Sequence, residues 1–208
     1  MTQVKVRNAS KKLPLSVWVT LGATPGCLQD VGKIPWIERQ IAPLMGCFVL
    51  RPGATTAPFA PKDLGFNANF SFNTPPLNCP TSGFPNGVNL FEFIVNNAFQ
   101  GKNAQETVDI SCVAGVNCAI RATLNGPAWN AGPAYADVKL IENGKIGTNS
   151  RRVGVYPVGC DTCTGRQHPP RCPKPLKPEK PQIEAICNVQ RNAANGGGII
   201  EVAYLGAL

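Results

Sequence analysis

Apolar and polar residues alternate along several short stretches of this chain. Between positions 15 and 21 every odd position is Leu or Val, and between 66 and 72 phenylalanine occupies three of the four even positions. A period of two is typical of a β-strand that buries one face. Both stretches are therefore predicted to be strands, and two more are predicted at 91–93 and 106–113.

Turn residues predict two local hairpins. Asn143-Gly144 separates Tyr135–Glu142 from the segment that starts at Lys145, and Asn-Gly is a strong signal for a tight β-turn. The second hairpin is predicted to join 187–192 to 199–205 across a glycine-rich turn at 195–198.

The composition favours the same all-β class. The chain has 208 residues, with 21 glycines, 20 prolines and 15% charged residues, which leaves little room for long helices. We expect a helix content below about 15%, against roughly a third in ordinary soluble domains.

At this length a single domain is expected over residues 1–208, with a Cys/Pro-rich loop lobe at 158–187 inside it. No apolar run approaches the roughly 18 residues of a membrane-spanning helix, so no membrane span is expected.

Two carboxylates lie in neighbouring predicted strands. Glu92 lies between Phe91 and Phe93, and Asp109 lies in the strand that ends before a Gly-Val-Asn loop at 115–117. Facing one cleft, the two would form either an acid–base pair for a glycosidic bond or a polar wall that binds loop amides. The spacing alone leaves both interpretations open.

Several segments, in their order along the chain, resemble the thaumatin-like proteins. Most of the resemblance lies in the region 91–118, and the remaining segments are Val4–Asn8, Ser16–Val19, Arg39–Ile41, Phe48–Gly53, Cys160, Cys163, Cys172-Pro173, Glu179–Pro181, Cys187 and Ile200–Tyr204. The resemblance implies a thaumatin-like antiparallel β-sandwich of roughly ten or eleven strands. It also implies disulfide-pinned loops and an opening hairpin made by the first two of these segments.

In that family an arginine and four acids line a cleft that is associated with β-1,3-glucan binding and, occasionally, with weak glucanase activity. Two of the acids are retained here as Glu92 and Asp109, whereas Ala114 and Lys174 stand where two others are expected. Phe70 stands near the place of the arginine. This chain therefore resembles a divergent member with a depleted acidic cleft, in which Lys174 is expected to favour the ionised form of Glu92. Binding without catalysis is the expectation that follows.

Nine cysteines favour an oxidising, extracellular compartment, and a cytosolic or virion location with reduced thiols is the alternative. The count is lower than the family's usual number, and an odd count leaves at least one cysteine outside intramolecular bridges. Cys112 and Cys118 are additions to the family pattern that flank the loop at Gly115, and we expect them to pair. The other disulfide candidates, implied by the resemblance, are Cys160, Cys163, Cys172 and Cys187. Met1 leads straight into a predicted strand without a basic flank or an apolar segment, so we expect either that a signal peptide precedes this sequence or that the protein has none.

Cys160, Cys163, His168 and Cys172 also form a second constellation. Their spacing is one residue short of a zinc knuckle, and tetrahedral zinc takes ligands of these kinds. With a net charge of +8, a nucleic-acid-binding knuckle protein is a further alternative. Pro169-Pro170 stiffens the loop that a knuckle must fold, so the disulfide interpretation ranks first and no cofactor is expected.

The sequence thus predicts a non-catalytic, carbohydrate-binding protein that recognises a polymeric surface such as cell-wall β-1,3-glucan, with weak β-glucanase activity left open. The alternative is a structural or assembly protein, such as a cell-wall or virion component, that uses the same scaffold for docking. The expected partner is a polysaccharide or a protein-assembly surface, and nucleic acid ranks below both.

Overall fold

The computed structural model describes residues 1–76, 87–97, 101–132, 135–144, 152–156 and 187–208. Strands dominate these ranges, and the helical elements that lie wholly within them are two short 3-10 turns, η1 (Val31–Lys33) and η3 (Ala193–Asn195). The strands are β1 (Thr2–Asn8), β2 (Leu15–Leu21), β3 (Arg39–Ala42), β4 (Met45–Leu50), β5 (Phe66–Phe72), β6 (Leu90–Val95), β7 (Gln105–Ser111), β8 (Cys118–Leu124), β9 (Leu140–Glu142), β10 (Val155–Tyr156), β11 (Val189–Asn192) and β12 (Gly198–Ala207). The all-β class predicted from the sequence is confirmed. In the part of the chain that is described, no helix is long and apolar enough to cross a membrane.

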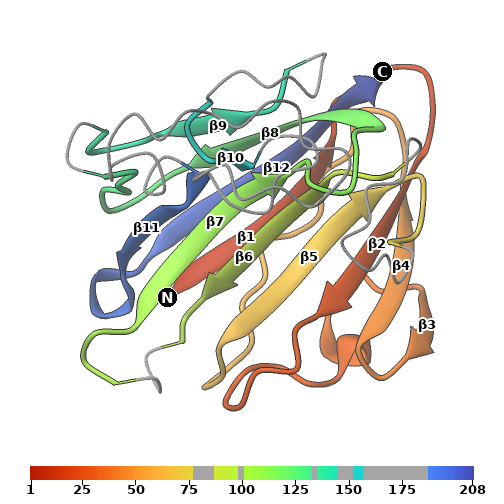
Figure 1. Cartoon of the computed structure of the whole chain (residues 1–208). Helices are drawn as coiled ribbons and strands as arrows, with labels where there is room; N and C mark the ends of the chain where they lie inside the picture. The colour runs from red at the N-terminus through yellow and green to blue at the C-terminus, as the bar shows by residue number, and fades with distance from the viewer. Residues whose placement is uncertain (77–86, 98–100, 133–134, 145–151, 157–186) are drawn as a thin grey trace.

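The strands form two sheets. The smaller one has four strands in the order β1-β12-β8-β9, and the larger one has eight, in the order β10-β7-β6-β5-β2-β4-β3 with β11 also paired to β7. Figure 1 shows the smaller sheet running behind the larger one. The expectation of antiparallel pairing throughout is corrected at two places, because β1 pairs with β12 and β10 pairs with β7 in parallel.

The core lies between the sheets and is built from the inward half of each alternating strand. Phe66, Phe70 and Phe72 of β5 are fully buried, and the rings of Phe66 and Phe93 meet edge to face with centroids 4.8 Å apart. Opposite them, the inward residues of β12, such as Val202, are equally buried. Burying a phenylalanine contributes roughly 1.5–3 kcal/mol, so the period of two read from the sequence is the pattern that holds the sheets together.

Both local pairings at the chain ends were predicted wrongly. β1 and β2 lie in different sheets instead of forming an opening hairpin, and β11 and β12 also separate, with β11 on β7 and β12 between β1 and β8. The crossing from β11 to β12 uses η3 and the positive φ of Gly197 and Gly198. A Cβ at Gly198 would collide with the carbonyl oxygen of Asn125, so this turn is shaped for a change of sheet.

Some predictions concern parts of the chain that the structure does not describe. The first arm of the Asn143-Gly144 hairpin is present as β9, and the second arm, from Lys145 onward, lies outside the described residues. The loop lobe at 158–187 also lies outside them, except for Cys187.

Candidate functional site

Glu92 and Asp109 lie side by side on the outer face of the larger sheet. Glu92 of β6 is the direct cross-strand partner of Asp109 of β7. The same transverse row continues to Asn69 of β5 and Thr20 of β2. Because directly opposed residues of a sheet point to the same side, these four side chains form one polar row, which we call the carboxyl row.

Burial sets the charge state of the two carboxyls. Asp109 is only 8% exposed, and burial, followed by the charge of Glu92, raises its pKa well above the ordinary value. Burial also raises the pKa of Glu92, against a smaller lowering by a side-chain hydrogen bond with Ser111. Desolvation and a like-charged neighbour both favour the neutral form. The pair therefore holds at least one proton where an isolated carboxylate would be ionised.

Three of the four side chains in the carboxyl row have a buried oxygen without a hydrogen-bond partner. Thr20 Oγ1, Asn69 Oδ1 and Asp109 Oδ1 are each buried without a hydrogen-bond partner. Buried polar atoms are nearly always paired in native proteins, and an orphan needs an explanation. The three orphans, on β2, β5 and β7, form a line of buried acceptors that the fold leaves unpaired.

Two details predicted for the cleft are corrected by the structure. Phe70 points into the core and is fully buried, so it cannot occupy the place of a cleft arginine, and the outward residue opposite Glu92 is Asn69. The pKa of Glu92 is raised by burial, and not lowered as expected from Lys174, which lies outside the described residues. Ala114 lies in the loop after β7, against Gly87, and supplies no acid there.

The cysteine predictions have mixed outcomes. Cys112 and Cys118 are both free thiols, so the predicted bridge between them is wrong. Their thiols bond to different asparagines, Cys118 to Asn89 Oδ1 at 3.4 Å and Cys112 to Asn143, because one follows β7 in the larger sheet and the other begins β8 in the smaller.

Cys187 is disulfide-bonded, and its partner is outside the ranges described. Cys160, Cys163, His168 and Cys172 also lie outside them, so the zinc constellation and the remaining disulfide candidates stay predictions. Within the described ranges, no cluster of three or more His, Cys, Asp or Glu side chains could hold a metal ion.

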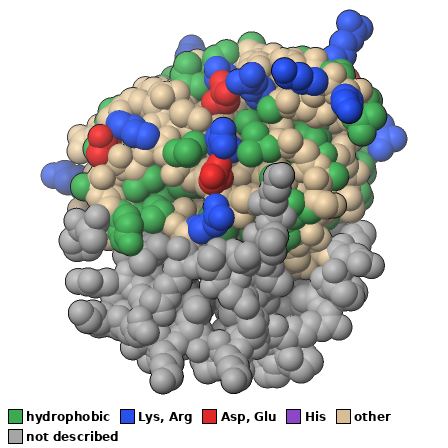
Figure 2. All heavy atoms as spheres, turned by 90° about the horizontal axis from the view of Figure 1, so that it is seen from above, with side chains coloured by type: hydrophobic (Ala, Val, Ile, Leu, Met, Phe, Trp, Pro, Cys, Tyr) green, Lys and Arg blue, Asp and Glu red, His purple; other side chains and the backbone are tan. Residues whose placement is uncertain are grey.

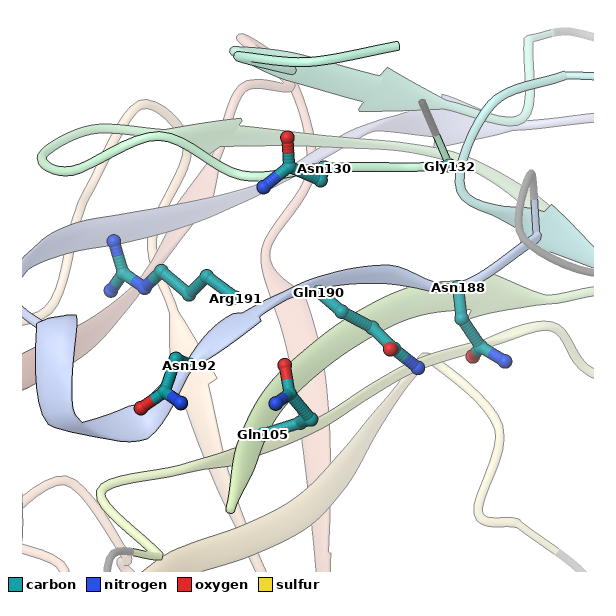
Figure 3. Close-up of a pocket in the computed structure, with 7 residues that line it drawn as sticks. All are labelled: Gln105, Asn130, Gly132, Asn188, Gln190, Arg191 and Asn192. Atoms are coloured by element: carbon teal, nitrogen blue, oxygen red, sulfur yellow. The ribbon is translucent and has the colours of Figure 1, made fainter. Parts of the chain in front are cut away.

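A second polar feature, which sequence reasoning missed, is a pocket of about 480 Å³ beside β11. Figure 3 shows its lining, which we call the amide pocket: Gln105, Asn130, Gly132, Asn188, Gln190, Arg191 and Asn192. A signal was present in the sequence, because carboxamides at 188, 190 and 192 alternate with Val189 and Arg191. That alternation places the amides on one face of the strand and the buried Val189 and Arg191 on the other.

The amide pocket lies on the same sheet face as the carboxyl row. Gln190 pairs with Thr107 and Asn192 with Gln105, and Thr107 and Gln105 share the face of Asp109 because they are two and four residues from it along β7. At a rise of about 3.3 Å per residue, the pocket floor at Gln105 lies roughly 13 Å along the strand from Asp109. The outer face therefore carries two adjacent polar areas.

A buried ion pair anchors β11 beneath the pocket. Arg191 Nε donates to Glu106 Oε2 at 2.7 Å, and Arg191 Nη2 donates to Thr2 Oγ1 and to the Gly197 carbonyl at 2.8 and 2.7 Å. The guanidinium also lies 4.0 Å above the ring of Trp129. This network joins β1, β7 and β11 at one point, and it fixes the outward direction of the neighbouring amides.

The outer face of the smaller sheet differs from this polar face because its charges are paired. Lys5 pairs with Glu201 at 2.6 Å and Arg121 pairs with Glu142 at 2.9 Å. Seen from above in Figure 2, basic and acidic side chains alternate along one row of the surface. Partly exposed pairs of this kind contribute about 0–1 kcal/mol each, and none of their carboxylate oxygens is among the orphaned atoms of the described residues.

The fold and the site define an all-β sandwich with a polar outer face on its larger sheet. No family model matches the chain, and no curated protein matches its sequence. Among solved structures, the chain is similar to a thaumatin-like xylanase inhibitor, with 12% identity, a TM-score of 0.42 and coverage of 98% of this chain and 99% of that one. At that identity and TM-score the likeness carries no argument about function.

Proposed function

We propose that this protein is a non-catalytic binding protein of thaumatin-like type, and that its polar outer face recognises a polysaccharide surface, with β-1,3-glucan as the target. The observation that carries the proposal is the carboxyl row, where the side chains of Thr20, Asn69 and Glu92 are partly exposed and where buried oxygens of Thr20, Asn69 and Asp109 have no hydrogen-bond partner. A saccharide offers many hydroxyl groups along a repeating chain, and these would form hydrogen bonds with the partly exposed side chains of the row.

The charge state of the row favours a neutral ligand. The raised pKa values of Glu92 and Asp109 favour the protonated form of the pair, and a protonated carboxyl presents less negative charge than an ionised one. A protonated carboxyl both donates and accepts a hydrogen bond. That capacity matches hydroxyl groups, which do the same, better than it matches a cation.

The same burial argues against turnover. Retaining glycosidases need an accessible ionised nucleophile beside a protonated acid. Asp109 is almost sealed from solvent and its raised pKa favours the neutral form, which is a poor nucleophile. Glu92 alone supplies a proton donor without an ionised partner that can reach an anomeric carbon.

Co-sedimentation with insoluble β-1,3-glucan tests the proposal. We expect the wild-type protein to be retained and Glu92→Ala to bind about tenfold more weakly, the loss of one to two hydrogen bonds. Glu142→Gln, which alters a carboxylate on the opposite sheet, is the matched control and should bind normally. No reducing sugar should be released.

Two outcomes would overturn the proposal. Release of reducing sugar that disappears in both Glu92→Gln and Asp109→Asn would make the pair catalytic. Retention that neither Glu92→Ala nor Asp109→Asn changes would make the row structural, and a structural or assembly protein on the same scaffold would then become the leading function.

A further inference from the structure

We propose that the amide pocket is a saccharide subsite of its own, which binds a short stretch of a neutral oligosaccharide through carboxamide–hydroxyl hydrogen bonds. This inference rests on the proposed function in one respect, because both take a polysaccharide as the ligand. It assigns a separate set of residues, because the carboxyl row contains none of the side chains that line the pocket.

The chemistry of the lining selects a neutral, hydroxylated ligand. Five of the seven lining residues carry carboxamides and none carries a carboxylate. The single charged group, Arg191, already donates to Glu106, Thr2, Pro127 and Gly197. The pocket therefore offers paired donors and acceptors without a free charge, whereas phosphate or carboxylate ligands are recognised by available Arg or Lys donors.

Two of the carboxamides are unoccupied, and their backbones are held rigidly. Asn130 and Gln190 exchange two backbone hydrogen bonds of 2.8 and 2.7 Å, which fixes the two residues opposite each other. In the described part of the chain, neither side chain makes a hydrogen bond. Each amide keeps two N–H donors and one carbonyl acceptor for a ligand, and the fixed backbones reduce the entropy lost on binding.

The neighbouring amides are oriented by one or two hydrogen bonds each. Asn188 donates to the Tyr156 hydroxyl at 2.6 Å, and Gln105 donates to the Asn103 carbonyl at 3.1 Å. Asn192 donates to the Lys102 carbonyl at 3.3 Å and accepts from the Ala194 backbone N–H at 2.8 Å. These contacts turn the amides while leaving hydrogen-bonding capacity at the pocket. A volume of about 480 Å³ lies within the range of roughly 300–1,000 Å³ that ligand sites occupy.

The experiment titrates ¹⁵N-labelled protein with soluble neutral oligosaccharides of β-1,3-glucose, xylose and mannose, and follows the side-chain NH₂ signals of Asn130 and Gln190. We expect these signals to shift with at least one of the oligosaccharides. The double variant Asn130→Ala/Gln190→Ala should bind that oligosaccharide about tenfold more weakly. Gln3→Ala, which removes a partly exposed carboxamide from the other sheet, is the matched control and should bind like the wild type.

The outcomes separate this inference from the proposed function. Retention on insoluble glucan with silent Asn130 and Gln190 signals would refute the subsite and leave the carboxyl row as the binding surface. Shifts with xylose or mannose oligomers alone would support the subsite and refute glucan as the target. Shifts with a sulfated oligosaccharide or an unstructured peptide, and with none of the neutral sugars, would overturn the assignment. The side-chain NH₂ signals of Asn130 and Gln190 in the wild-type protein test the subsite even if the double variant fails to fold.

Discussion

The buried pair of Arg191 and Glu106 offers the sharpest test of how the fold supports the polar face. Arg191→Met removes the cation and leaves Glu106, which is fully buried, with a hydrogen bond from the Thr2 hydroxyl and one from the Asn96 amide but no compensating charge. Breaking a buried ion pair in this way costs about 3–5 kcal/mol. That is a large part of the roughly 5–15 kcal/mol that stabilises an ordinary domain.

A double variant separates the charge effect from lost packing. Arg191→Met/Glu106→Gln carries no buried charge, so its cost should fall to about 1–3 kcal/mol, the penalty for leaving backbone acceptors such as the Gly197 carbonyl unpaired. Arg121→Met removes one member of an exposed ion pair with Glu142 and should cost less than about 1 kcal/mol.

Urea denaturation followed by tryptophan fluorescence measures all of these variants, since the Trp129 ring stacks on Arg191. A cost below about 1 kcal/mol for Arg191→Met, within the range of exposed pairs, would refute the reasoning. The proposed coupling would also be refuted if the loss of unfolding free energy in Arg191→Met/Glu106→Gln equalled the sum of the losses in the two single variants, because residues that interact directly deviate from additivity.

Two further predictions concern pH and thiol reactivity. Because the pKa of Asp109 is raised in the fold, the folded chain holds its proton more tightly than the unfolded chain, and wild-type stability falls as pH rises above the ordinary carboxyl range. Asp109→Asn should therefore gain thermal stability over wild type at pH 8 but not at pH 4, and an equal difference at both would contradict this. Burial raises the pKa of Cys112 and Cys118 to about 12, so native protein at pH 8 should be alkylated first at the partly exposed free thiol of Cys47. This order concerns the four free thiols in the described ranges, Cys27, Cys47, Cys112 and Cys118, and mass spectrometry that finds Cys112 modified as fast as Cys47 would contradict the burial.

The strands could be predicted from the sequence because their inward positions are apolar at a period of two. The stretches at 15–21 and 66–72 match β2 and β5 from first to last residue. Each of these strands lies inside the larger sheet with one face on the core, so the local pattern carries the information that the fold uses. The placement of Glu92 opposite Asp109 follows from the same alternation once β6 and β7 are paired.

The pairing partners could not be predicted, because they depend on residues far apart in the chain. β1 finds its partner in β12, with Thr2 opposite Gly198, and no local signal marks a pairing across almost the whole sequence. A turn rich in glycine suggested a hairpin at 195–198, yet the same glycines allow the chain to change sheets. Turn residues indicate where a chain bends without fixing which strand it meets next.

The amide pocket was missed for a related reason. The alternation of carboxamides in 188–192 is visible in the sequence, but its meaning depends on β11 lying beside β7. Only that register brings Gln190 and Asn192 next to Gln105 and onto the face of Asp109. The bridge predicted between Cys112 and Cys118 failed similarly, because closeness in sequence does not show that one residue follows a strand of the larger sheet while the other begins a strand of the smaller sheet.

The polar groups on the two outer faces of the sandwich are paired differently, and this contrast supports the proposed site. On the smaller sheet, Glu201 and Glu142 each have basic partners. On the larger sheet, the buried Asp109 keeps an orphaned oxygen and a raised pKa, an arrangement that costs stability and that an apolar residue would relieve. Departures from a satisfied interior are expected where a ligand supplies the missing partner, so the carboxyl row and the adjoining amide pocket are where binding should be sought first.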